Sequence, residues 1–122
     1  MDDIRVLIVD DEEELAKTIA ERLEIRGIQC QTTSDSDKAL DLIKSQKPDV
    51  VVLDLMMPGI GGLGILKQIK SLEINIPVVL LTGYGSNEMT LEGMNLGAFD
   101  YVLKPCNLDD LITKIQDAKK SK

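Results

Sequence analysis

The sequence predicts an α/β domain in which five parallel strands alternate with five helices, a (βα)5 doubly wound arrangement. Short apolar runs rich in β-branched residues alternate along the chain with segments whose apolar residues recur at helical spacing. One run alternates apolar and polar residues instead, which is typical of a strand at a sheet edge. A chain of 122 residues can bury one sizeable core, so we expect a single domain over 1–122.

The first half of the chain supplies the first two strands and two helices. The run Val6–Val9 is the first strand, and Ile28–Thr32 is the alternating edge strand. Between them lies a helix with apolar residues four apart and a glycine near its end: Leu15, Ile19, Leu23 and Gly27. Ser34 and Asp37 resemble a capping box at the start of the second helix, which Pro48 ends.

The second half continues the same alternation. Its strands are Val50–Leu53, Val78–Leu81 and Asp100–Leu103. The third helix carries Leu63, Leu66 and Ile69 on one side. The fourth, over about Asn87–Leu96, contains Gly93 and has weak helix propensity. Asn107 caps the last helix, and we expect 119–122 to be a frayed tail or linker.

The expected strand order places several polar residues together. With the alternating strand at the edge and right-handed crossovers, the order 2-1-3-4-5 fits best. Ligands of such sheets bind at the carboxyl ends of the strands, where the direction of winding reverses, here between the first and third strands. The side chains that directly follow strands should therefore share one rim of the sheet: Asp10, Asp11, Asp54, Thr82 and Lys104.

These five side chains suit the acceptance of a phosphoryl group. Three carboxylates in one crevice repel one another unless a cation neutralises them, and Mg²⁺, which prefers oxygen ligands, is the expected cofactor. Lys104 adds a second positive charge and Thr82 a hydroxyl donor, while Asp54 is the nucleophile. Taken singly, each residue is more often a cap, a turn residue or a solvated charge. Their common rim favours the functional interpretation.

Composition excludes several other functions. The chain has no histidine, which excludes His-based acid–base catalysis and His-containing triads. Cys30 and Cys106 lie far apart without metal-ligand spacing, and we expect reduced thiols. The net charge of −7 disfavours direct nucleic-acid binding. No apolar run approaches the roughly 20 residues that span a bilayer, so we expect no membrane contact and a cytoplasmic location.

Four segments at the strand ends resemble the receiver domain of bacterial two-component response regulators: 9–12 (VDDE), 53–59 (LDLMMPG), 80–83 (LLTG) and 101–105 (YVLKP). The likeness runs from about Ile4 to Ala118. It implies a flavodoxin-like three-layer sandwich with the strand order 2-1-3-4-5. The reasoning from the edge strand is therefore not independent of the resemblance. The likeness also implies a signalling domain, not an enzyme, whose Asp54 is phosphorylated in a Mg²⁺-dependent reaction.

The resemblance assigns a role to each rim residue. The implied metal ligands are Asp10, Asp11, Asp54 and the backbone carbonyl of Met56. Lys104 is implied to contact the phosphoryl group, and the peptide bond between Lys104 and Pro105 to be cis. Thr82 and Tyr101 match the switch pair of the family. The residues implied to tune the lifetime of the phosphorylated state are Met56 and Tyr84.

The resemblance also implies partners. The phosphoryl donor is a sensor histidine kinase or a phosphotransfer protein of a phosphorelay. The signal leaves through the fourth helix and the fifth strand toward an output domain or partner protein, and phosphorylation can lead to a homodimer. Departures from the common family pattern at Gly61-Gly62, Gly93 and Cys106 bear on the shape and mobility of the output surface.

Other interpretations fit less well. Residues 59–64 match G-x-G-x-x-G, but the first glycine comes five residues after Asp54 and no acid near position 84 could bind a ribose. An FMN protein would place a phosphate loop where the acidic run 10–14 stands. A haloacid dehalogenase-type phosphatase has a second Asp at the place of Met56. The remaining alternative is a pseudo-receiver, a docking module that is never phosphorylated, and the complete rim set argues against it.

Overall fold

Five parallel strands form one sheet in the order β2-β1-β3-β4-β5 in the computed structural model, which describes residues 3–57, 61–83 and 87–121. The strands are β1 (Ile4–Val9), β2 (Ile28–Thr33), β3 (Val50–Asp54), β4 (Val78–Thr82) and β5 (Asp100–Leu103). This arrangement confirms the expected fold class and strand order. The alternating strand β2 lies at the sheet edge and pairs with β1.

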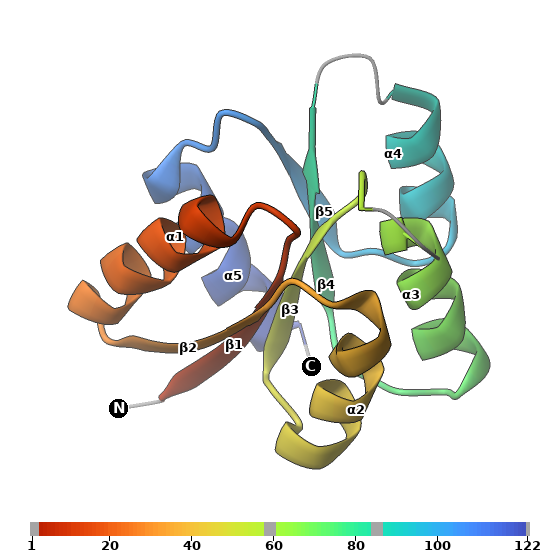
Figure 1. Cartoon of the computed structure of the whole chain (residues 1–122), viewed down its shortest axis with the longest axis horizontal. Helices are drawn as coiled ribbons and strands as arrows, with labels where there is room; N and C mark the ends of the chain where they lie inside the picture. Colours follow the sequence, from red (N-terminus) through yellow and green to blue (C-terminus); the bar gives the residue numbers. More distant parts are fainter. Residues whose placement is uncertain (1–2, 58–60, 84–86, 122) are drawn as a thin grey trace.

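Helices cover both faces of the sheet (Figure 1). The helices are α1 (Glu13–Ile25), α2 (Ser36–Gln46), α3 (Gly61–Ser71), α4 (Asn87–Asn95) and α5 (Leu108–Lys120). Side chains of α1 and α5 share one apolar core with the sheet, and side chains of α2 and α3 share the other, against which α4 packs. Among the described residues, no helix is long and apolar enough to cross a membrane.

Burial on both faces explains why the central strands are continuous apolar runs. In β1, Val6 and Ile8 belong to the core of α1 and α5, whereas Leu7 and Val9 belong to the core of the other helices. Every residue of β3 is buried. In β2, only one face is covered, so Gln29 and Gln31 are exposed and the sequence alternates.

Backbone hydrogen bonds align the strand ends along one rim. The amide of Asp10 donates to the carbonyl of Thr33 at 3.1 Å, and the amide of Lys104 donates to the carbonyl of Thr82 at 2.7 Å. In the sheet register, Asp54 lies beside Leu81, and Thr82 lies beside Leu103. Asp54 and Thr82, which end β3 and β4, and Asp10 and Lys104, which directly follow β1 and β5, therefore lie at the same edge of the sheet.

Two local expectations were wrong. The N-cap of α2 is Asp35, whose side chain accepts from the amide of Asp37, while Ser34 donates to Glu13 instead. The tail also begins later than expected, because α5 continues to Lys120. The ammonium of Lys119 donates to the carbonyl of Asp3 at 2.7 Å, which ties the end of this helix to the start of β1.

Candidate functional site

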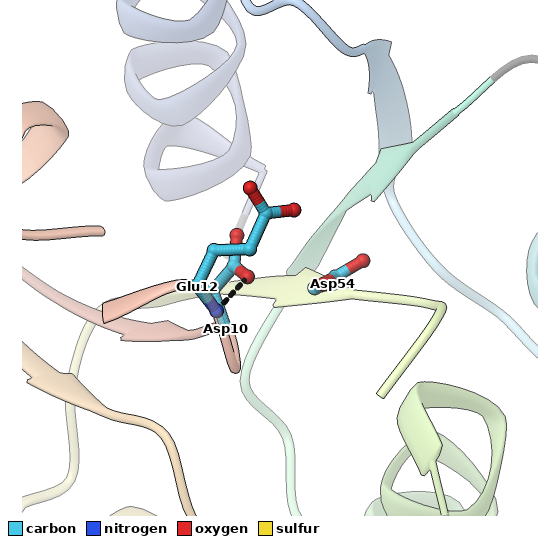
Figure 2. Close-up of side chains that lie close together, drawn as sticks. All are labelled: Asp10, Glu12 and Asp54. Carbon is cyan, nitrogen blue, oxygen red and sulfur yellow. Dashed lines mark hydrogen bonds between the residues drawn. The ribbon is translucent and has the colours of Figure 1, made fainter. Parts of the chain in front are cut away.

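Two buried carboxylates stand at the rim where the direction of winding reverses. Asp10 follows β1 and is 0% exposed, and Asp54 ends β3 and is 3% exposed. One oxygen of each side chain is held by a backbone amide: Asp10 Oδ1 accepts from the amide of Glu12 at 2.9 Å, and Asp54 Oδ1 accepts from the amide of Met56 at 3.0 Å. These bonds fix both side chains and leave Oδ2 of each for other partners; Figure 2 draws the bond between Glu12 and Asp10.

Lys104 connects the carboxylates. Its Nζ lies 3.1 Å from Asp10 Oδ2 and 3.3 Å from Asp54 Oδ2. It also lies 3.1 Å from Oε1 of Glu12, whose side chain is 60% exposed. Lys104 directly follows β5, so the ammonium reaches across the carboxyl end of the sheet from one side of the winding reversal to the other.

The charges of these groups depend on one another. Burial raises the pKa of the Asp54 carboxyl; the Met56 amide lowers it, the charge of Asp10 raises it, and Lys104 lowers it again, with a net rise. Burial alone would lower the pKa of Lys104, but the adjacent carboxylates of Asp10 and Glu12 and the charge of Asp54 outweigh it, so this pKa is raised. The ammonium therefore stays charged and supports an ionised Asp54.

The site contains an acidic residue that the sequence analysis did not single out. Carboxylate oxygens of Asp10, Glu12 and Asp54 all lie within 4.8 Å of one another, and this group is the one found in the described part of the chain. Asp11 is exposed and is not a member. The sequence places Glu12 in the acidic run 10–14, but its approach to Lys104 depends on the path of the turn after β1, where its amide donates to Asp10 Oδ1.

Thr82 and Tyr101 lie on neighbouring strands. Thr82 is buried, and its Oγ1 has no hydrogen-bond partner among the described residues. Tyr101 is 40% exposed on β5. Lys114 of α5 holds it there, since its Nζ donates to the carbonyl of Tyr101 at 2.7 Å and lies 5.5 Å from the centre of the ring.

The remaining predicted residues lie around the rim or outside the described residues. Met56 follows β3 and is 58% exposed. The peptide bond between Lys104 and Pro105 is cis. Tyr84, which was expected to tune the lifetime of the phosphorylated state, lies outside the described residues.

Comparison with known proteins relates this geometry to a family. The family model described as "Response regulator receiver domain" matches residues 6–116. The chain is 38% identical over 114 residues to "Regulatory protein AtoC" of Escherichia coli, which covers 93% of this chain and 25% of the relative. It is 39% identical over 112 residues to "Probable transcriptional regulator ycf27" of Guillardia theta, covering 92% of this chain and 44% of the relative. The chain thus spans less than half the length of either relative.

A solved structure agrees with these matches. The receiver domain of the Francisella response regulator 1452 superposes with a TM-score of 0.90 at 35% identity, covering 98% of both chains. The family match over residues 6–116 includes Asp10, Asp54, Thr82 and Lys104.

Proposed function

Because the chain belongs to the receiver domain family of response regulators, we propose that it is a signalling domain switched by phosphorylation of Asp54. The observation that carries this proposal is the contact of Asp54 with Lys104, at 3.3 Å, on a rim where Asp54 is nearly fully buried. A buried carboxylate with one oxygen held by a backbone amide and the other beside an ammonium is a nucleophile of fixed direction.

The reaction that we propose is phosphoryl transfer from a phosphohistidine. An oxygen of Asp54 forms a bond to phosphorus as the phosphorus–nitrogen bond breaks, and the electron pair of that bond returns to the imidazole nitrogen, which takes up a proton. Lys104 balances the negative charge on the transferred oxygens. The hydroxyl of Thr82, which lacks a partner among the described residues, is free to donate to one of them.

The donor set fits a divalent cation. Asp10, Glu12 and Asp54 offer oxygens within 4.8 Å of one another, and the buried Asp10 Oδ2 has no hydrogen-bond partner among the described residues, although it lies beside Lys104. Mg²⁺ prefers such hard oxygen ligands and, when bound, supplies charge neutralisation to the phosphoryl oxygens. We propose that Asp10 and Asp54 hold it with the carbonyl of Met56; Asp11 is the further ligand that the resemblance implies.

The switch that we propose passes through Thr82 and Tyr101. Movement of Thr82 toward the phosphoryl group leaves space on β4 that the ring of Tyr101 can fill by turning inward from its exposed position. The surface of α4 and β5 changes shape as a result and passes the signal to an output domain or partner protein.

The proposed partners are a sensor histidine kinase or a phosphotransfer protein, and a second copy of the chain after phosphorylation. Nucleic-acid binding is not proposed for these 122 residues, since their net charge is −7. The function of any longer protein that contains them is a separate matter, because the relatives are more than twice as long.

The proposal is tested by intact-mass measurement after incubation with Mg²⁺ and acetyl phosphate. The wild type should gain one phosphoryl group, and Asp54→Asn should gain none. Omission of Mg²⁺ should slow the gain strongly in the wild type. An equal gain in Asp54→Asn would refute the assignment of the acceptor. A wild type that never gains a phosphoryl group, even with its cognate kinase, would favour the pseudo-receiver alternative.

A further inference from the structure

Lys104 has more acidic partners than phosphoryl transfer needs. Asp10, Asp54 and Glu12 each place a carboxylate oxygen 3.1–3.3 Å from its Nζ. Glu12 comes from the turn between β1 and α1, and Figure 2 shows its carboxylate beside that of Asp10. When all three carboxylates are ionised, they and the ammonium together carry a formal charge of −2.

The three partners differ in how easily they can leave Lys104. The side chains of Asp10 and Asp54 are 0% and 4% exposed, and each has its other oxygen bonded to a backbone amide. The side chain of Glu12 is 60% exposed. Its carboxylate can turn into water at little cost, because a partly exposed ion pair contributes little net stability. Glu12 is therefore the partner that Lys104 can exchange.

We infer that Glu12 is a positioning residue that holds Lys104 until an incoming phosphoryl group displaces it, an inference that rests on the proposed function. The donor is an anion and approaches a rim that Glu12 makes more negative. Lys104 contacts the transferred oxygens only after Nζ exchanges the Glu12 carboxylate for one of them. Glu12 thus slows phosphoryl acceptance.

The same charge acts in the opposite direction on cation binding. The carboxylate of Glu12 lies within 4.8 Å of the oxygens of Asp10 and Asp54, so it strengthens the attraction of the rim for a divalent cation. Removal of this charge should therefore weaken Mg²⁺ binding and yet speed phosphorylation once Mg²⁺ is saturating. A merely structural role for Glu12 would not move the two quantities in opposite directions.

The test uses Glu12→Gln in the full chain, with Glu14→Gln as the matched control. Glu14 lies in the first turn of α1, two residues after Glu12, and lines a hollow with Asp10, Lys17 and Lys38. Among the described residues, the carboxylates that pair with Lys104 are those of Asp10, Glu12 and Asp54, so the control removes an equal charge near the site without removing a partner of Lys104. Calorimetric titration gives the Kd for Mg²⁺. Intact mass against time gives the rate with acetyl phosphate at saturating Mg²⁺, where the bond from phosphorus to Asp54 forms as acetate leaves.

For Glu12→Gln, we expect the rate to rise and the Kd for Mg²⁺ to increase, each about two- to fivefold, as for the loss of a partly exposed ion pair. Glu14→Gln should match the wild type in both quantities. A Glu12→Gln rate equal to or below that of the wild type would overturn the inference, as would an equal rise in Glu14→Gln. A wild type that accepts no phosphoryl group would instead refute the proposed function.

Discussion

Replacement of Gly62 by alanine should destabilise the domain and disturb the phosphoryl acceptor. Gly62 lies in the first turn of α3, which packs directly on the backbone that follows β3. A Cβ at this position would collide with the carbonyl oxygen of Asp54 and lie 2.7 Å from the Cα of Leu55. Both atoms are backbone, so no side-chain rotation relieves the clash, and α3 must move away from Asp54.

The size of the effect follows from two opposing contributions. Overpacking in a close-packed core costs about 1–3 kcal/mol, and contacts with backbone atoms belong at the upper end. Alanine regains at most about 1 kcal/mol of helix propensity over glycine. The net loss in the free energy of unfolding is then about 2 kcal/mol, which lowers the Tm of a domain of this size by about 10 °C.

Thermal unfolding followed by circular dichroism measures this loss, with Gly93→Ala as the matched control. Gly93 also lies in a helix, but a Cβ there would meet the Cδ1 of Leu80, a side-chain end that can turn aside. Gly93→Ala should therefore lose less than about 1 kcal/mol, because its gain in helix propensity offsets a smaller clash. A Gly62→Ala Tm at or above that of the wild type, or an equal drop in Gly93→Ala, would contradict the close approach of α3 to β3.

Three further predictions concern the site and the thiols. Burial raises the folded-state pKa of Asp54, so its ionised carboxylate reduces the stability of the folded protein above about pH 4. In the absence of metal, Asp54→Asn should therefore raise the Tm at pH 7, and this gain in Tm should vanish as the pH falls toward about 4. A gain that does not change with pH would refute that origin. Met56→Asn should shorten the life of the phosphorylated form, since an amide orients water better than a thioether, and an unchanged decay in excess Mg²⁺ would count against it. Burial raises the pKa of Cys30 to about 12, so at pH 8 it should react with iodoacetamide far more slowly in the folded than in the unfolded chain, as peptide mapping would measure.

The strands and the rim could be predicted because they depend on one strong pattern. A parallel strand covered on both faces has a sequence that is a short apolar run. The first polar residue after the run lies at the carboxyl end of the sheet. The predicted strands Val50–Leu53 and Val78–Leu81 therefore lie within the observed strands, each of which continues one residue further, to Asp54 and Thr82. The strand order then places Asp10, Asp54 and Lys104 on one rim, and the long side chain of Lys104 brings its ammonium to both carboxylates.

Side-chain direction in turns could not be predicted in the same way. Which of two adjacent acids joins the cluster depends on the path of one short turn: Glu12 reaches Lys104, whereas Asp11 is exposed and lies outside the cluster of Asp10, Glu12 and Asp54. The cap of α2 depended equally on a one-residue choice between Ser34 and Asp35. The extent of α5 was underestimated because the contact that orders Lys119 comes from Asp3 at the other end of the chain.

The central claim is that Asp54 is the residue that accepts the phosphoryl group. Borohydride reduces an aspartyl phosphate to homoserine, so treatment of the phosphorylated protein followed by peptide sequencing by mass spectrometry locates the modified position. We predict homoserine at position 54 and unmodified Asp10 and Asp11. Homoserine at position 10 or 11, with Asp54 intact, would contradict the account.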